Sequence, residues 1–157
     1  MTRLYGRAVK SERVVEAVPD TRFHQTTILS SVRLDRTTIP FVFEGALNGA
    51  IFRTYVTQFL APSLKPGDIV IMDNLSSHKV KGVVEAIQAV GASVMFLPPY
   101  SPDLNPIELM WSKVKAILRR LKIRAKESLD QAIAYALDCV STSDIAAWFT
   151  HDGYSLR

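Results

Sequence analysis

The chain has 157 residues, 48% of them apolar and 22% charged, and carries a net charge of +4. This composition is typical of a globular domain with its own core and argues against intrinsic disorder, while the basic balance favours a polyanionic partner such as nucleic acid. The single cysteine, Cys139, excludes an internal disulfide and a multi-cysteine zinc site, and fits a cytoplasmic protein. No apolar run is long enough for a membrane span, and the N-terminal stretch lacks the apolar core of a signal peptide.

The first part of the chain favours strands. Residues 13–18 are compatible with a short strand, and residues 26–34 and 38–46 are rich in β-branched and aromatic side chains. The short polar stretch between the last two predicts a hairpin. From residue 48 the apolar period becomes helical, and Pro62 is expected to close that helix. Its predicted buried face consists of Phe52, Tyr55, Val56 and Phe59.

The second part alternates between strands and helices. Residues 69–72 and 93–97 are predicted to be strands, the first of them covered on both faces because its apolar residues are not interrupted by polar ones. Residues 77–91 predict an amphipathic helix that Gly91 ends. A long helix over 105–121 and one or two helices within 127–149 follow. This order indicates one α/β domain over residues 1–157, with a mixed sheet and helices on both faces. The helix over 77–91 is expected to turn these residues inward: Val80, Val83, Val84, Ile87 and Val90.

Asp73 directly follows the strand at 69–72, in the stretch "IVIMDNLSSHK". Ligands of open α/β sheets gather outside the carboxyl ends of the strands, so this position suits a functional carboxylate. Asp73 and Asn74 are also good turn formers, and a purely structural role in the turn explains the position equally well.

Glu108 stands at the start of the long predicted helix. Asn105, Pro106 and Glu108 have the pattern of a helix N-terminus, and a capping role alone explains this glutamate. At 100° per residue, however, Ser112, Lys115, Arg119 and Lys122 fall within about 40° of Glu108. An acid at the head of a row of cations suits a metal-bound phosphodiester with neighbouring phosphates along the helix; the alternative is a solvated basic face. The predicted apolar stripe comprises Ile107, Trp111, Val114, Leu118 and Leu121, and the basic residues are Lys113, Lys115, Arg119, Arg120, Lys122, Arg124 and Lys126.

Breaking or joining a phosphodiester requires an activated oxygen nucleophile and stabilisation of a leaving oxygen. Two divalent ions about 3.5–4 Å apart supply both. Mg²⁺ prefers carboxylate oxygens, so Asp73 and Glu108 have suitable character, and a third acid on an adjacent strand is expected.

The segments "VIMDNLSSHK" and "FLPPYSPDLNPIELMWSKVK" resemble the second and third catalytic segments of the DDE transposases of the mariner superfamily, in particular its bacterial insertion-sequence branch. Thirty-four residues separate Asp73 from Glu108, which matches that branch. "RLYGRA" (3–8) is similar to the segment after the first catalytic strand of the family, and "WFTHDGY" (148–154) is similar to its C-terminal end. The resemblance therefore covers nearly the whole chain.

The resemblance implies a ribonuclease-H-like fold and DNA nicking at transposon ends, followed by attack of the freed 3′-hydroxyl on target DNA. It implies that Asp73 and Glu108 are catalytic metal ligands for two Mg²⁺ ions, for which Mn²⁺ can substitute. It also implies DNA as the partner of the basic helix, and a homo-oligomer or an N-terminal transposase fragment as protein partner. Asn74, His78, Tyr100, Asp103 and Asn105 lie within the matching motifs and are candidates for the wall of the site.

The family's first catalytic aspartate lies on a strand upstream of the segment that "RLYGRA" resembles. We therefore expect the first aspartate, its central strand and the helix-turn-helix region to lie outside this sequence. The chain alone is expected to be inactive, and to be marginally folded, aggregation-prone or completed by a partner segment. Asp20 and Asp35 have the wrong context to replace that aspartate, and Glu16 is the one substitute that the sequence offers.

Other functions remain compatible with the sequence. The chain could be a nucleic-acid-binding remnant without activity, a subunit that regulates an intact transposase by mixed assembly, or another nuclease of the same fold such as a junction resolvase. The segment "SPDLNPIE" favours a transposase over the resolvase.

Overall fold

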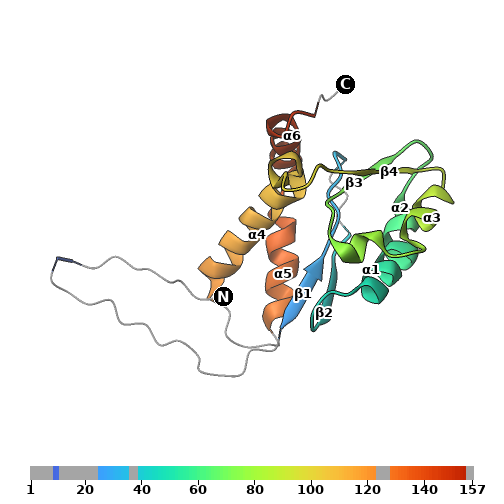
Figure 1. Ribbon diagram of the computed structural model, residues 1–157. Coiled ribbons are helices and arrows are strands. Elements are labelled where there is room, and N and C mark those ends of the chain that lie inside the picture. Colours follow the sequence, from blue (N-terminus) through green and yellow to red (C-terminus); the bar gives the residue numbers. More distant parts are fainter. Residues whose placement is uncertain (1–8, 11–24, 36–38, 123–127, 155–157) are drawn as a thin grey trace. The chain divides into compact units, whose positions relative to one another are not determined.

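The structure is a computed structural model, and it describes residues 9–10, 25–35, 39–122 and 128–154 (Figure 1). Contacts between residues divide the chain into two compact units. The larger unit comprises His24–Met110 with Ser141–Arg157, and the smaller unit comprises Met1–Phe23 with Trp111–Val140. Within the described ranges, no helix combines the length and the apolar character needed to cross a bilayer.

The larger unit begins with an antiparallel strand pair. Strand β1 (Thr26–Leu29) pairs with β2 (Phe41–Glu44), with Ile28 opposite Val42, which confirms the predicted hairpin strands. Both strands are shorter than predicted. Gly45, at φ +97°, directly follows β2, and its carbonyl accepts a hydrogen bond from the Thr27 hydroxyl at 2.6 Å. The strand expected at 13–18 lies outside the described residues.

A parallel strand pair carries the site. Strand β3 (Ile69–Met72) pairs with β4 (Ser93–Phe96), with Met72 opposite Phe96, and both strands were predicted. In the described part of the chain, β1–β2 and β3–β4 are separate two-stranded sheets. The expectation that β3 is covered on both faces is wrong at its start, because Ile69 is 58% exposed.

The helix predicted from residue 48 consists of three successive segments, of which the middle one is π-helical: α1 (Gly49–Tyr55), the π-helical turn η1 (Val56–Leu60) and α2 (Ala61–Ser63). A π turn holds more residues than an α turn, so the next buried position comes one residue later than an α period predicts. Phe59, expected in the core, is 40% exposed, and Leu60 is buried instead. Pro62 lies within α2, and the helical segment ends one residue later, at Ser63.

The single helix predicted over 77–91 is wrong. Residues Ser76–Lys79 form a 3-10 turn, η2, and α3 spans only Val83–Gln88. Gly82 separates the two at φ +95°, a left-handed conformation that glycine adopts without strain. The Glu85 carboxylate accepts the Gly82 N–H at 2.8 Å and so caps the start of α3. Of the predicted inward residues, Val83 and Ile87 are fully buried.

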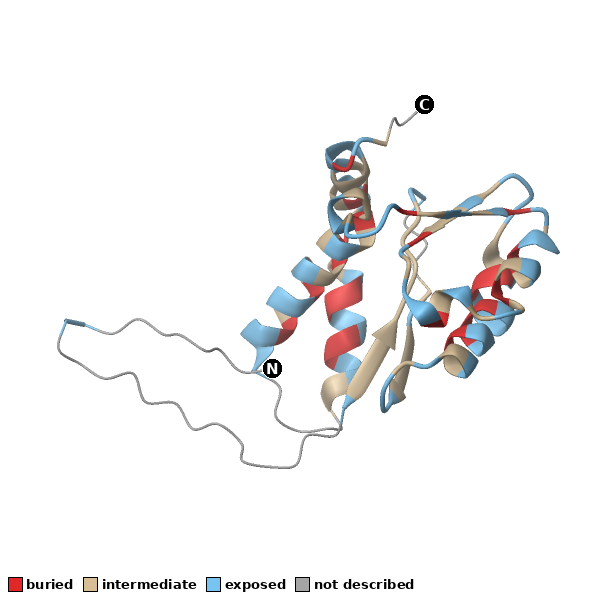
Figure 2. Cartoon of the chain, viewed as in Figure 1, coloured by how far each residue is buried: buried red, intermediate tan, exposed pale blue. Residues whose placement is uncertain are grey.

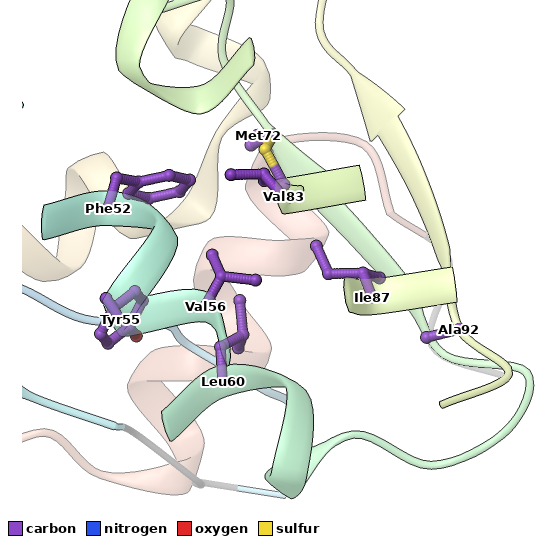
Figure 3. Packing of buried hydrophobic residues seen from close by; sticks show 8 residues of the cluster. All are labelled: Phe52, Tyr55, Val56, Leu60, Met72, Val83, Ile87 and Ala92. Carbon is purple, nitrogen blue, oxygen red and sulfur yellow. The ribbon is translucent and has the colours of Figure 1, made fainter. Parts of the chain in front are cut away.

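One hydrophobic cluster joins these helical segments to β3 (Figure 3). The Tyr55 hydroxyl donates a hydrogen bond to the Ile39 carbonyl at 2.9 Å, and burial raises the pKa of this tyrosine to about 12. Because the cluster includes Met72, the last residue of β3, it fixes the point at which the strand ends and the polar segment begins. Its buried members are Phe52, Tyr55, Val56, Leu60, Met72, Val83, Ile87 and Ala92.

An ion pair connects the segment after β1 to the residue before β3. The Arg33 guanidinium binds both carboxylate oxygens of Asp68, at 2.5 and 2.7 Å. Such a bidentate pair is geometrically specific, and it ties the two strand pairs together at this end. Asp68 also accepts the Lys65 N–H at 2.7 Å, which shapes the turn that leads into β3.

The predicted long helix is α4 (Pro106–Leu121), and the predicted C-terminal helices are α5 (Leu129–Asp138) and α6 (Thr142–His151). The buried face of α4 is centred on Met110, Val114 and Leu118. Leu121, which was predicted to belong to the apolar stripe of this helix, is 40% exposed. In α5 the buried residues recur along one face (Figure 2).

Candidate active site

The end of β3 places Asp73 and Asn74 beside the end of β4. The Leu97 N–H donates to the Met72 carbonyl at 2.9 Å and extends the parallel ladder by one residue. The Asn74 amide then donates to the Leu97 carbonyl. The chain segments that leave the two strands are thereby joined, as expected at the carboxyl edge of a parallel pair.

Two contacts hold the Asp73 carboxylate. Oδ1 accepts the Leu75 N–H at 3.0 Å, which forms an Asx turn, and lies 2.7 Å from His78 Nδ1. The structural role that the sequence suggested for Asp73 is thus present. Both contacts use Oδ1, and the side chain is 53% exposed, so the carboxylate keeps a face toward solvent.

His78 links this carboxylate to the hydrophobic cluster. It lies in η2, with its N–H bonded to the Leu75 carbonyl at 2.9 Å, and its ring centre is 4.2 Å from that of Phe52. Its side chain is 16% exposed. Nδ1 is buried and has no well-aligned hydrogen-bond partner among the described residues, so the short approach to Asp73 is an electrostatic contact off the ideal hydrogen-bond direction.

Glu108 reaches the site from the first turn of α4. A 3-10 turn, η3 (Pro102–Leu104), leads into the helix, and the Glu108 N–H donates to the Asn105 carbonyl at 2.9 Å. The Tyr154 hydroxyl, from the segment after α6, donates to the Leu104 carbonyl at 2.7 Å and anchors this turn. Glu108 itself is exposed.

A pocket with a volume of about 200 Å³ brings Asp73 and Glu108 together. Of the other residues predicted for the site wall, Asn74, Tyr100 and Asn105 line it. His78 contacts Asp73 but is not in the lining. Asp103 is exposed and is not in the lining either. The remaining lining residues are Leu75, Leu97, Pro98, Pro99, Ser101 and Pro102.

Sequence reasoning did not identify the parts played by Leu97 and Tyr154. The Leu97 carbonyl accepts the Asn74 amide because the register of β3 with β4 aligns the two residues. No local sequence pattern encodes this register. Tyr154 lies far along the chain from Leu104, and the only signal for it was the similarity of "WFTHDGY" to the C-terminal end of a known family.

The basic residues predicted to bind DNA belong mostly to the part of α4 in the smaller unit. Lys115, Arg119 and Arg120 are exposed, as is Lys122 directly after the helix, whereas Lys113 is half-buried. Arg124 and Lys126 lie outside the described residues. The described stretch therefore offers cations to solvent along α4.

The donors in the pocket fit one hard cation. Mg²⁺ is commonly held by one or two carboxylates together with substrate phosphates and retained waters, and Asp73 and Glu108 supply two carboxylates. Among the described residues no group of three or more His, Cys, Asp or Glu side chains is placed to hold a metal ion. Asp35 is not in the pocket lining and lies 3.2 Å from Arg33, and Asp20 and Glu16 lie outside the described residues.

Comparison with known proteins identifies the family. The sequence profile of the DDE superfamily endonucleases matches residues 1–130, and the chain belongs to this family. Among solved structures, the chain is similar to the Mos1 strand transfer complex, with a TM-score of 0.71 and 17% identity. The match covers 99% of this chain and 51% of that one, so the chain spans about half the length of the Mos1 chain. This likeness confirms the predicted ribonuclease-H-like fold, and no curated protein sequence matches.

Proposed function

We propose that the chain is part of the catalytic domain of a transposase, which cleaves DNA strands and joins them to a target. One observation carries the proposal: Asp73 and Glu108, separated by thirty-four intervening residues in a DDE superfamily chain, line the same pocket. They come from a strand end and a helix start, so their relative position depends on the fold. The bacterial insertion-sequence branch of the family is part of the same proposal.

Asp73 and Glu108 would hold Mg²⁺, or Mn²⁺ in its place. When bound, divalent ions lower the pKa of an attacking water or hydroxyl and stabilise charge on the leaving oxygen. The protein's own part is to hold the carboxylates in place: Leu75 and His78 fix Asp73, and the anchored turn before α4 fixes Glu108. A pair of ions needs a third carboxylate, which we expect from outside the described residues.

DNA is the proposed substrate and partner, at transposon ends and at the target. The exposed cations Lys115, Arg119 and Arg120 follow Glu108 along the sequence of α4. Contacts of these side chains with phosphates would make affinity fall steeply with salt and depend little on sequence.

The test of this function measures metal binding and strand cleavage separately. We expect the chain to bind Mn²⁺, detected by electron paramagnetic resonance, and Asp73→Asn and Glu108→Gln each to weaken that binding by at least about tenfold. Asp103→Asn is the matched control, because Asp103 lies in the same segment but outside the pocket lining. Mg²⁺-dependent nicking of duplex DNA would follow when a third carboxylate completes the site. Mn²⁺ affinity that is equal in all four proteins would contradict the proposal.

A non-enzymatic nucleic-acid-binding module is the second candidate, and the exposed cations of α4 favour it. It would bind DNA with the same steep salt dependence, but a chelator and Asp73→Asn would leave the affinity unchanged. A regulator of an intact transposase would also bind DNA with an affinity that a chelator and Asp73→Asn leave unchanged. It would in addition lower the activity of the intact transposase when the two proteins are mixed.

We also infer that a further strand completes the sheet. The described residues form two separate pairs, β1–β2 and β3–β4, and each pair has an outer edge whose backbone groups need partners. A strand supplied from outside the described residues would pair with those edges. We therefore expect the backbone amides at those edges to be protected from hydrogen exchange once that strand is in place. Fast exchange at both edges in the assembled catalytic domain would contradict this inference.

A further inference from the structure

Tyr100 has an unusual backbone conformation at the rim of the pocket. Its φ of +59° lies in the left-handed region, which a bulky side chain rarely adopts. Pro98, Pro99 and Pro102 surround it in the sequence and restrict the backbone on both sides. Residues held in such conformations concentrate at binding and catalytic sites, where the surrounding structure maintains the strain.

The Tyr100 side chain is fully exposed, at 100% of its accessible surface. It borders the same pocket as Asp73 and Glu108, and Leu75, another lining residue, is 48% exposed. A tyrosine usually buries most of its ring in a folded protein, as Tyr55 does here at 2% exposed. The rigid loop therefore holds an aromatic face in solvent next to the two carboxylates.

We propose that Tyr100 is a stacking platform for an unpaired nucleobase beside the phosphate that the carboxylate pocket handles. The inference rests on the proposed function and narrows its substrate to DNA with an exposed base next to the reacting phosphate. Within a duplex both faces of a base are covered by its neighbours, so the ring can stack only on a base at a strand end or one displaced from the helix. Stacking requires an accessible π face and little else, which suits a tyrosine that is fully exposed.

The ring's orientation follows from the loop and not from packing. Removing the ring while keeping the left-handed backbone is therefore possible, because asparagine and glycine both tolerate a positive φ. Tyr100→Asn and Tyr100→Gly test stacking without loss of the fold, and Tyr100→Trp keeps an aromatic face. Tyr135→Gln is the matched control, since Tyr135 is also an exposed tyrosine, at 55%, but belongs to α5.

The experiment titrates the full chain, in Ca²⁺ to prevent cleavage, into a short duplex with a 3′ single-stranded overhang that carries 2-aminopurine. If the 2-aminopurine base stacks on Tyr100, the fluorescence of 2-aminopurine should be quenched. We expect Tyr100→Asn and Tyr100→Gly to abolish the quenching and to bind the overhang roughly 5- to 100-fold more weakly. Tyr100→Trp and Tyr135→Gln should behave as the unaltered chain, and all proteins should bind a fully paired duplex equally.

Two results would overturn the inference. One is quenching and overhang affinity that do not depend on the residue at 100 while the chain still binds DNA. The other is that Tyr100→Asn changes self-association of the chain and not DNA binding, which would make the ring a protein contact. If the unaltered chain binds neither DNA form at any salt concentration, the proposed function itself fails, and this outcome is distinct from the other two.

Discussion

His78 Nδ1 lies 2.7 Å from Asp73 Oδ1, and the same imidazole packs against Phe52, with 4.2 Å between ring centres and 35° between the ring planes. One face of the histidine thus contacts the hydrophobic cluster that includes Phe52, and its polar edge contacts the carboxylate. Because Phe52 is buried in α1, the position of Asp73 depends on helix packing as well as on the strand that precedes it.

The contact predicts a specific rescue pattern at position 78. The amide of asparagine can place a nitrogen where Nδ1 stands, whereas glutamine extends one methylene further. We expect His78→Ala and His78→Gln to weaken Mn²⁺ binding by about 10- to 100-fold, as loss of residues that orient metal ligands usually does, and His78→Asn to retain most of it. Electron paramagnetic resonance titration measures this. Equal losses in all three variants would show that His78 acts only through packing on Phe52.

The bidentate pair between Arg33 and Asp68 predicts an acid-sensitive part of the stability. Hydrogen bonding to the Arg33 guanidinium, and then to the Lys65 N–H, lowers the pKa of Asp68 below its ordinary value. A depressed pKa stabilises the folded chain above the unfolded pKa of about 3.9, and that contribution is lost as the pH falls through the folded pKa. Asp68→Asn should therefore reduce the free energy of unfolding at pH 7 by about 1–2 kcal/mol.

The difference between the two proteins should shrink as the pH falls below 4, which urea unfolding followed by circular dichroism across that range would measure. Asp35→Asn is the control: Asp35 also contacts Arg33, at 3.2 Å, but its side chain is 49% exposed. A loss from Asp35→Asn as large as that from Asp68→Asn would mean that the charge of Arg33 matters and the bidentate geometry does not.

Periodicity in the sequence predicted the strands β3 and β4 and the bounds of α4, because each carries a clear run of apolar positions. It failed where the backbone departs from a regular α-helix. Gly82 at φ +95° divides the helix expected over 77–91, and the π turn moves burial from Phe59 to Leu60. Neither change alters the apolar pattern, so counting positions could not reveal it.

The two carboxylates of the candidate site were predicted from motif resemblance and spacing, since a structural role in its own segment is enough to explain each of them. Their common pocket depends on the pairing of β3 with β4 and on the turn before α4. The approach of His78 to Asp73 depends on the 3-10 turn η2, where an α-helix had been predicted. Such relations come from tertiary structure, and local sequence does not specify them.

At Gly49, substitution by alanine is expected to destabilise the protein, which is the opposite of its usual effect in a helix. At most exposed helical positions Gly→Ala stabilises a protein by about 0.4–1 kcal/mol. A Cβ at position 49 would lie 2.3 Å from Val80 Cγ2, in the segment between η2 and α3. Gly49→Ala should therefore lower the free energy of unfolding by about 1–3 kcal/mol, because a β-branched side chain has no rotamer that moves away easily.

Pairing Gly49→Ala with Val80→Ala checks the cause. Shortening Val80 removes the clashing methyl group, so the double variant should be more stable than Gly49→Ala alone in thermal unfolding. If the two substitutions simply add, the close approach of α1 to Val80 is not what requires glycine at position 49.

Tyr154 predicts a link between the C-terminal segment and the acid on α4. Its hydroxyl donates to the Leu104 carbonyl at 2.7 Å, and its ring packs edge-on against Phe149 with 5.6 Å between centres. Tyr154→Phe keeps the ring and removes only the donor, so the free energy of unfolding should fall by about 0.5–1.5 kcal/mol. Because the anchored turn leads into Asn105 and Glu108, Mn²⁺ affinity should fall as well, under conditions in which the variant is fully folded.

Burial, followed by the nearby Asp152, raises the pKa of the Tyr154 hydroxyl above its ordinary value, so the hydroxyl remains a donor through the neutral and mildly alkaline range. A raised pKa gives stability that is complete below the unfolded pKa of about 10 and is lost as the pH rises through the folded pKa. The unaltered chain should therefore lose more stability above pH 10 than Tyr154→Phe does. Metal affinity that is unchanged in the phenylalanine variant, with the expected loss of stability, would show that the bond holds the C-terminal segment in place without positioning Glu108.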